Sequence, residues 1–237
     1  MKRTALPLAA AALALLVTGC SGSSGSSGAK PTKAQGTAAA TAINLKGADL
    51  AGYESAPHDS TETGGALPQD VATCLGIGTK DAGGRDIVDL SSDDFSKGAP
   101  PDGAQVSSEV EVVPSTDNAK KLLSSLKGSK AAGCLGDSFD QELTKEIGTS
   151  SPGVTVGKVD VTTLSPSEKD TDGALGFRLT IPISASGVTI DVTTEIRFFI
   201  RKHTEVSLLT VTYGTRTTVD ADGLYATLVA RAKTSAV

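Results

Sequence analysis

Alternating apolar and polar residues in the last third of the chain predict an antiparallel sheet. Apolar side chains occupy every second position over 175–181 and again, in a longer run interrupted only by Thr194, over 188–200. We expect two more strands, over 154–163 and over 206–213, the last of them apolar on both faces. Turn-forming residues such as Asp172 and Gly173 separate these segments, and short connections are typical of antiparallel neighbours. The pattern therefore predicts a four-stranded meander.

Apolar residues spaced three and four apart predict helices before and after this meander. A short helix is expected over 67–75, and a second one from residue 116. A third starts at Ser138, whose spacing to Gln141 is that of a capping box, and Asp220 caps a final helix. Apolar runs predict two further strands, over 85–90 and over 104–113. We therefore expect an α+β fold, in which an antiparallel sheet carries helices mainly on one face.

The first twenty residues have the pattern of a bacterial lipoprotein signal. Lys2 and Arg3 precede an apolar run over 5–17, which is shorter than the about 20 residues needed to cross a bilayer. Residues 17–20 (Val-Thr-Gly-Cys) end this run and resemble the lipobox. The resemblance implies cleavage before Cys20, and attachment of a diacylglyceryl group and a further acyl chain such as palmitate to this residue. The alternative is an ordinary secretory signal in which the cysteine is incidental. Because two or three acyl chains anchor stably, we expect a lipid-anchored protein on the extracytoplasmic face of the cell membrane.

This pattern divides the chain into three segments. Residues 1–19 are expected to be the signal peptide, 20–45 a flexible linker that begins with the lipidated cysteine, and 46–237 the extracytoplasmic domain. Residues 21–28 contain only Ser and Gly, and residues 29–41 are mainly Ala, Lys, Thr, Gly and Pro. Such a composition buries too little apolar surface to offset the entropy lost on ordering.

Charge and composition restrict the partners. Removal of Lys2 and Arg3 with the signal changes the formal net charge from −5 to −7. Nucleic acids and anionic lipid surfaces call for a basic patch, so neither is expected as the main partner. The chain has no Trp and only 3% aromatic residues, so its core must be mainly aliphatic, and stacking on sugars or bases is a weak expectation.

Three cysteines are present, and acylation of Cys20 would leave Cys74 and Cys134 as a pair. A disulfide is the natural interpretation in an oxidising compartment, and the loop that it closes is worth roughly 4 kcal/mol in loop-closure entropy. The alternative, a reactive thiol or a metal-binding pair, lacks a nearby His or third Cys.

None of the short motifs reaches the pattern of a catalytic or metal site. His58 and His203 have no further ligand at metal-binding spacing. Residues 170–173 and 220–223 look like parts of a calcium loop, but a hydrophobic residue stands where that loop needs its glutamate. Ser124 and Lys127 resemble the S-x-x-K motif of penicillin-recognising enzymes, whose other two motifs are missing or in the wrong order. We therefore expect no enzyme, no metal and no cofactor.

A strand, a helix and a cysteine follow one another over 107–134 in an order that resembles an actinobacterial pattern. The strand over 107–113, the helix that contains Ala119, and then Cys134 are similar to the extracellular sensor domain of PknH-type serine/threonine kinases, and to lipoproteins that carry this domain alone. The similarity covers about residues 65–235. That family tends to have a Trp before the cysteine and a second disulfide, whereas here Ala-Ala-Gly precedes Cys134 and one pair remains. The resemblance implies a non-catalytic sensing module with a cleft between sheet and helices.

Three hypotheses about function follow. The favoured one is a binding or sensing lipoprotein for an envelope lipid, glycan or peptide, or for a partner protein, with its ligand-binding residues unknown. The second is a structural or assembly factor without a small ligand, and the third is a hydrolase that uses Ser124. A deep apolar pocket would indicate a lipid, and a shallow polar cleft a glycan or protein.

Overall fold

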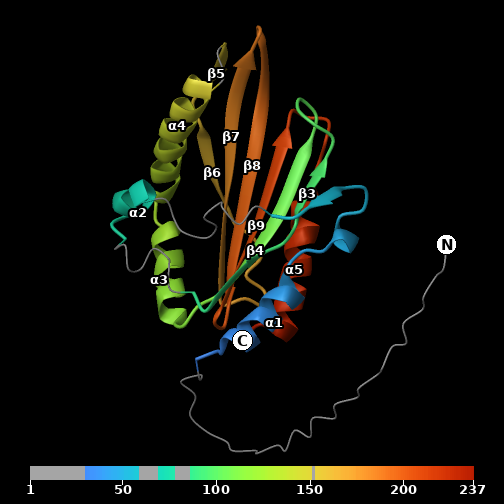
Figure 1. Cartoon of the computed structure of the whole chain (residues 1–237). Helices are drawn as coiled ribbons and strands as arrows, with labels where there is room; N and C mark the ends of the chain where they lie inside the picture. Colours follow the sequence, from blue (N-terminus) through green and yellow to red (C-terminus); the bar gives the residue numbers. More distant parts are fainter. Residues whose placement is uncertain (1–29, 59–68, 78–85, 151–152) are drawn as a thin grey trace, which may run out of the picture.

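The computed structural model describes residues 30–58, 69–77, 86–150 and 153–237 (Figure 1). Within them the chain forms five α-helices and a nine-stranded antiparallel sheet, which confirms the predicted α+β class. The helices are α1 (Lys33–Ile43), α2 (Gln69–Leu75), α3 (Thr116–Leu126), α4 (Ala131–Ser150) and α5 (Ala221–Ser235), with a 3₁₀ turn η1 (Gly47–Asp49). The strands are β1 (Glu54–Ala56), β2 (Val88–Ser91), β3 (Asp94–Lys97), β4 (Ala104–Val112), β5 (Val154–Val156), β6 (Asp160–Leu164), β7 (Gly173–Ala185), β8 (Val188–Arg201) and β9 (Thr204–Tyr213).

The predicted meander forms the centre of the sheet. The strand order is β1-β3-β4-β9-β8-β7-β5, with β2 also paired to β4 and β6 to β7. The segment expected as one strand over 154–163 is two strands, β5 and β6, and both pair with β7. Between them, the Gly157 backbone NH donates a 2.7 Å hydrogen bond to the Pro182 carbonyl oxygen. The pairing of β4 with β9 joins the N-terminal strands to the meander in a single sheet.

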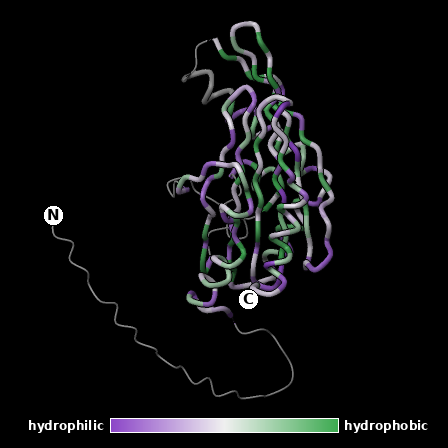
Figure 2. Tube along the Cα trace, turned by 90° about the vertical axis from the view of Figure 1, so that its right-hand side faces the viewer, coloured by the Kyte–Doolittle hydropathy of each residue, from purple (hydrophilic) through white to green (hydrophobic). Residues whose placement is uncertain are grey.

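Alternation along the long strands produces two hydrophobic cores, one on each face of the sheet. In β7, Ala174 belongs to one core and Leu175 to the other; in β8, Phe199 and Ile200 are divided in the same way. Figure 2 shows hydrophobic and hydrophilic positions interspersed along the strands of the sheet. Both cores need a cover, which explains why the helices, expected mainly on one face, are divided between the two. Helices α1 and α5 cover one face, and α2, α3 and α4 lie on the other (Figure 1).

Helix α1 corrects the prediction of a flexible linker over 20–45, which is wrong for Lys33–Ile43. Thr32 and Gln35 form a capping box at its start, and its C-terminal turn ends in the fully buried Ile43. The buried residues share one face at helical spacing: Gly36, Ala39, Ala40 and Ile43. These small side chains let the helix lie close to α5, β2 and β4. The prediction weighed composition alone, whereas Ala is the best helix former and the buried stripe is set by spacing. The folded domain therefore includes residues before 46.

The predicted disulfide joins α2 to α4. Cys74 and Cys134 are bonded, with their Cα atoms 5.8 Å apart. Cys134 is buried, whereas Cys74 is exposed. Helix α4 begins at Ala131, ahead of the predicted start at Ser138. The predicted cap of the last helix is confirmed, because the Gly223 backbone NH donates to Asp220 Oδ1 over 3.0 Å.

No helix in the described parts of the chain combines the length and the hydrophobicity that a membrane span needs.

Candidate functional site

A cavity of about 280 Å³ lies between the sheet and helices α3 and α4. Its walls are mostly apolar: Leu122 and Leu126 of α3, Leu135 and Phe139 of α4, Leu175 and Phe177 of β7, and Ile196 and Phe198 of β8. Its polar lining is confined to three glutamates and one serine: Glu109, Glu111, Glu205 and Ser207. The cavity therefore has an apolar body and an acidic end.

The apolar walls follow directly from sequence periodicity. Each helix contributes two residues spaced four apart, which therefore share a face, and each strand contributes two residues spaced two apart. Leu175 and Phe177 lie opposite Phe198 and Ile196 in the β7–β8 pairing, so four apolar side chains meet on one side of the sheet. Leu122, Leu126 and Phe139 remain half-buried, because part of each side chain faces the cavity rather than the core.

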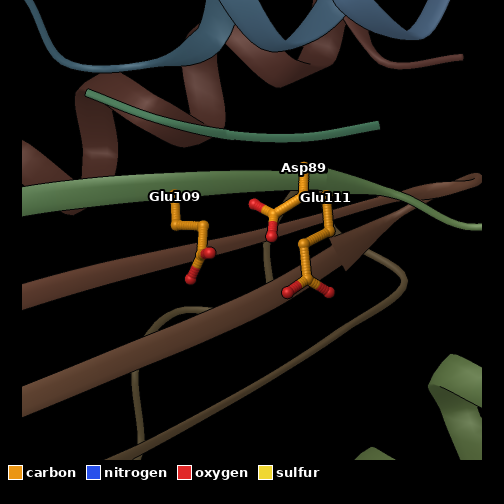
Figure 3. A group of neighbouring side chains, drawn as sticks. All are labelled: Asp89, Glu109 and Glu111. Atoms are coloured by element: carbon orange, nitrogen blue, oxygen red, sulfur yellow. The ribbon is translucent and has the colours of Figure 1, made fainter. Parts of the chain in front are cut away.

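The acidic end is formed where β2, β4 and β9 lie side by side. Glu111 of β4 is paired with Glu205 of β9 and with Asp89 of β2. Glu109 lies two residues before Glu111 in β4 and therefore on the same face of the sheet. Figure 3 shows the carboxylates of Asp89, Glu109 and Glu111 on one side of β4, with helices α1 and α5 on the other side. One carboxylate oxygen from each of these three residues lies within 4.8 Å of the others. Strand register thus gathers four acidic side chains at one place.

Burial and mutual repulsion give these carboxyls unusual protonation behaviour. Burial, with the nearby Asp86 charge adding to it, raises the pKa of Glu111 to about 9 and that of Glu205 to about 7. Burial and the interaction with Asp89 also raise the pKa of Glu109. Neither lysine nor arginine is among the described residues that line the cavity. The glutamates therefore hold protons near neutral pH, because burial and the neighbouring carboxylates outweigh the opposite effect of His58 on Glu109.

Glu205 is the most enclosed member of this group. It is 7% exposed, and within the described part of the chain its carboxylate forms no hydrogen bond or ion pair. One oxygen of Glu109, Oε1, is likewise buried without a hydrogen-bond partner among the described residues. Buried carboxylates are normally paired or hydrogen-bonded, so this end of the cavity presents acceptor groups that the described residues do not satisfy.

This arrangement offers two kinds of chemistry. Asp89, Glu109 and Glu111 present the hard oxygen ligands that Ca²⁺ and Mg²⁺ prefer, and could hold a divalent cation. The carboxyls that line the cavity could instead receive a positively charged or hydrogen-bonding head group whose apolar remainder occupies the cavity.

Among the described residues, none of those singled out from the sequence is part of the cavity lining. Cys20 falls outside the described residues. Neither Cys74 nor Cys134 lines the cavity, although Cys134 lies on α4 directly before the lining residue Leu135. His58 Nδ1 lies 3.0 Å from Asp94 Oδ1. His203 Nδ1 lies 3.0 Å from the Val113 carbonyl oxygen, at the end of β4.

The other motifs also have structural partners. Lys127 of the S-x-x-K string pairs with Glu168, while Ser124 is exposed on α3. Asp170, in one of the two calcium-like segments, lies 3.2 Å from Lys233 Nζ, and Asp220, in the other, caps α5.

The acidic group was not predicted from the sequence, although the alternation of glutamate and valine in β4 is a partial signal of it. In Glu109-Val110-Glu111-Val112 the valines alternate with glutamates, which indicates a strand with a buried face and a polar face. A polar face is ordinarily solvent-exposed, so nothing in the local pattern suggested that α3 and α4 partly enclose this one. Only the long-range pairing of β4 with β9 brings Glu205 to the same end.

Comparisons with known proteins add little. No family model matches the chain, and no curated protein sequence matches it. Among solved structures, one match is a protein of unknown function, PA94 from Pseudomonas aeruginosa, described as a putative regulator. It shares 12% sequence identity, with 66% of this chain and 85% of that chain covered and a TM-score of 0.20. At that score the similarity indicates nothing about the fold or function of this chain.

Proposed function

We propose that this chain is a non-catalytic binding domain that takes the apolar part of a small envelope molecule into the cavity between α3, α4 and the sheet. Acyl chains on Cys20 would hold the domain at the extracytoplasmic face of the cell membrane. The observation that carries the proposal is the lining: eight apolar side chains surround the body of the cavity, and its polar groups stand at one end. Ligand sites typically combine a hydrophobic wall with a few placed polar groups.

The size and lining favour a short lipid-like molecule over a glycan. At about 280 Å³ the cavity lies near the lower limit of ordinary small-molecule sites. A glycan carries hydroxyl groups along its whole length and would need hydrogen-bonding partners throughout, which the apolar walls do not offer. A single short acyl or aryl group requires only the apolar surface that α3, α4, β7 and β8 supply.

Alkanol binding tests this proposal. The full-length chain carrying Cys20→Ser would be titrated with 1-octanol and followed by calorimetry and thermal unfolding. We expect saturable binding and a raised melting temperature, because a ligand that binds only the folded state stabilises it. Leu126→Trp should abolish both effects by filling the cavity from α3. Lys120→Trp is the matched control, since Lys120 is an exposed residue of the same helix.

Two results would overturn the proposal. One is a chain that binds no alkanol, and the other is equal binding by the Leu126→Trp variant and its control. The first result would favour the alternative of a structural or assembly factor that acts through protein contacts.

A further inference from the structure

We propose that the acidic end of the cavity binds an ammonium group, so that the ligand is a small amphiphilic amine whose apolar part fills the cavity and whose charged nitrogen contacts Glu205 and its strand partner Glu111. This inference rests on the proposed binding function and specifies the chemical class of the ligand.

The first observation is that the apolar and acidic parts form one continuous cavity. Phe198 on β8 and Ser207 on β9 are paired neighbours, and Ser207 is in turn paired with Glu109 on β4. All three residues line the same cavity, as does Glu205 two residues before Ser207. A molecule lying on Phe198 therefore reaches the carboxylates within the width of two strands, which is about 10 Å.

The second observation is the state of Glu205. This side chain is nine-tenths buried, lines the cavity, and has no hydrogen bond or ion pair within the described residues. A buried ionised carboxylate without a partner is strongly unfavourable, and the ordinary remedy is a hydrogen-bonded positive charge. An ammonium group offers three donors and one positive charge at a single atom, which suits carboxylates carried at paired positions of two adjacent strands.

The third observation is the sign of every charge that acts on these glutamates. Asp89 on β2 and Asp86 just before it add negative charge, and β4 and β9 contribute only the glutamates themselves. His58 is the positive group that acts on the set, through Glu109, and it also contacts Asp94. On the neighbouring helix, Lys127 is engaged with Glu168. The described surroundings are therefore predominantly negative, and a cationic ligand would be stabilised where an anionic one would be repelled.

A bare divalent cation accounts for less of this geometry. Such an ion would use Asp89, Glu109 and Glu111, whose oxygens lie within 4.8 Å of one another. It would leave Glu205 outside its set of ligands and give the apolar walls no role. An amphiphilic amine uses both ends of the cavity, so we take it as the occupant.

The experiment compares three molecules of the same length and different charge. Octylamine, 1-octanol and octanoate would each be titrated calorimetrically into the full-length chain carrying Cys20→Ser, at pH 8. Alkylammonium groups resemble the lysine side chain and remain charged at this pH. We expect octylamine to bind about tenfold or more tightly than 1-octanol, since a charge-assisted hydrogen bond contributes that much, and octanoate to bind weakest.

Variants of the glutamates test directly whether these carboxylates bind the amine. Glu205→Gln keeps the shape of the side chain and removes its charge, so octylamine affinity should fall about tenfold while octanol affinity stays unchanged. Glu111→Gln should act in the same direction and serves as a second variant. Glu142→Gln, at an exposed position of α4, is the matched control and should change neither affinity. Lowering the pH to 5 protonates the glutamates and should weaken octylamine binding alone.

The possible failures are distinguishable. Equal affinity for octylamine and 1-octanol, or an unchanged preference in Glu205→Gln, would overturn the ammonium assignment while leaving the cavity as an apolar binding site. Failure of all three molecules to bind would overturn the proposed function as well. Binding of CaCl₂ that excludes octylamine would replace the amine with a divalent cation.

Discussion

Replacing Ile43 by Ala tests whether α1 is part of the folded domain. Ile43 is fully buried in the last turn of α1, in the core that includes Val88 and Leu228. The substitution removes three buried carbons, worth about 0.8 kcal/mol each in transfer free energy, and leaves a cavity whose cost is added to this. Ala is the better helix former by a few tenths of a kcal/mol, which offsets a small part. We therefore expect a loss of about 3 kcal/mol in the free energy of unfolding.

Urea unfolding of the Cys20→Ser chain, followed by circular dichroism with the disulfide intact, measures this loss. With a urea dependence of about 2–3 kcal/mol/M, the midpoint should fall by about 1 M or more at an unchanged slope. Thr41→Ala is the control, because Thr41 is an exposed residue of the same helix and its loss should leave the midpoint nearly unchanged. If both variants unfold at the midpoint of the parent chain, α1 contributes nothing to stability and the flexible-linker interpretation is restored.

Three further predictions concern stability. Replacing both Cys74 and Cys134 by Ala opens a loop with a sequence separation of 60 residues, and should lower the free energy of unfolding by roughly 4 kcal/mol. As a control, a reductant should destabilise the parent chain but not this variant. Burial raises the pKa of Glu111 to about 9 from 4.5 in the unfolded chain, so its contribution to stability is full below pH 4.5 and is lost as the pH rises toward 9. The melting temperature of Glu111→Gln should therefore increasingly exceed that of the parent as pH rises, and a gap that stays constant would contradict this. Arg231 donates hydrogen bonds from both terminal nitrogens to the Asp49 carboxylate, at 2.7 and 2.8 Å. Arg231→Lys keeps the charge but loses this geometry, so it should lower the free energy of unfolding, measured in urea, by about 1–2 kcal/mol. An unchanged midpoint would show that the paired geometry contributes nothing.

Local patterns were sufficient for the elements whose structure is decided by near neighbours. The alternation in β7 and β8 fixed which residues face each core, because a shift of one residue would exchange the two faces. The cap at Asp220 is likewise a short-range interaction, confirmed by its hydrogen bond to Gly223. Cys74 and Cys134 could be paired by elimination once Cys20 was set aside, although that assignment of Cys20 stays a prediction.

Features that depend on distant parts of the chain could not be predicted in this way. Helix α1 has an alanine-rich, low-complexity composition, and its buried face can be recognised as a core face only when β2, β4 and α5 are placed against it. The acidic end of the cavity has the same origin, since Glu205 follows Glu111 by more than ninety residues and meets it only through the register of β4 and β9. Each glutamate alone resembles an ordinary exposed strand residue.

The short stretch of chain between Cys20 and the start of α1 at Lys33 would limit how far the cavity can lie from the membrane. On the proposal that Cys20 is acylated, thirteen peptide units join the anchor to the first helical residue, and whatever their conformation they span at most about 45 Å. That length is comparable to the full thickness of a bilayer with its head groups. The cavity would thus be confined to a thin layer above the membrane, where amphiphiles dissolved in the bilayer are far more concentrated than in bulk water. Its ligand would be exchanged with the bilayer rather than with the solution, and the partition between cavity and membrane would then decide how much of the protein is loaded.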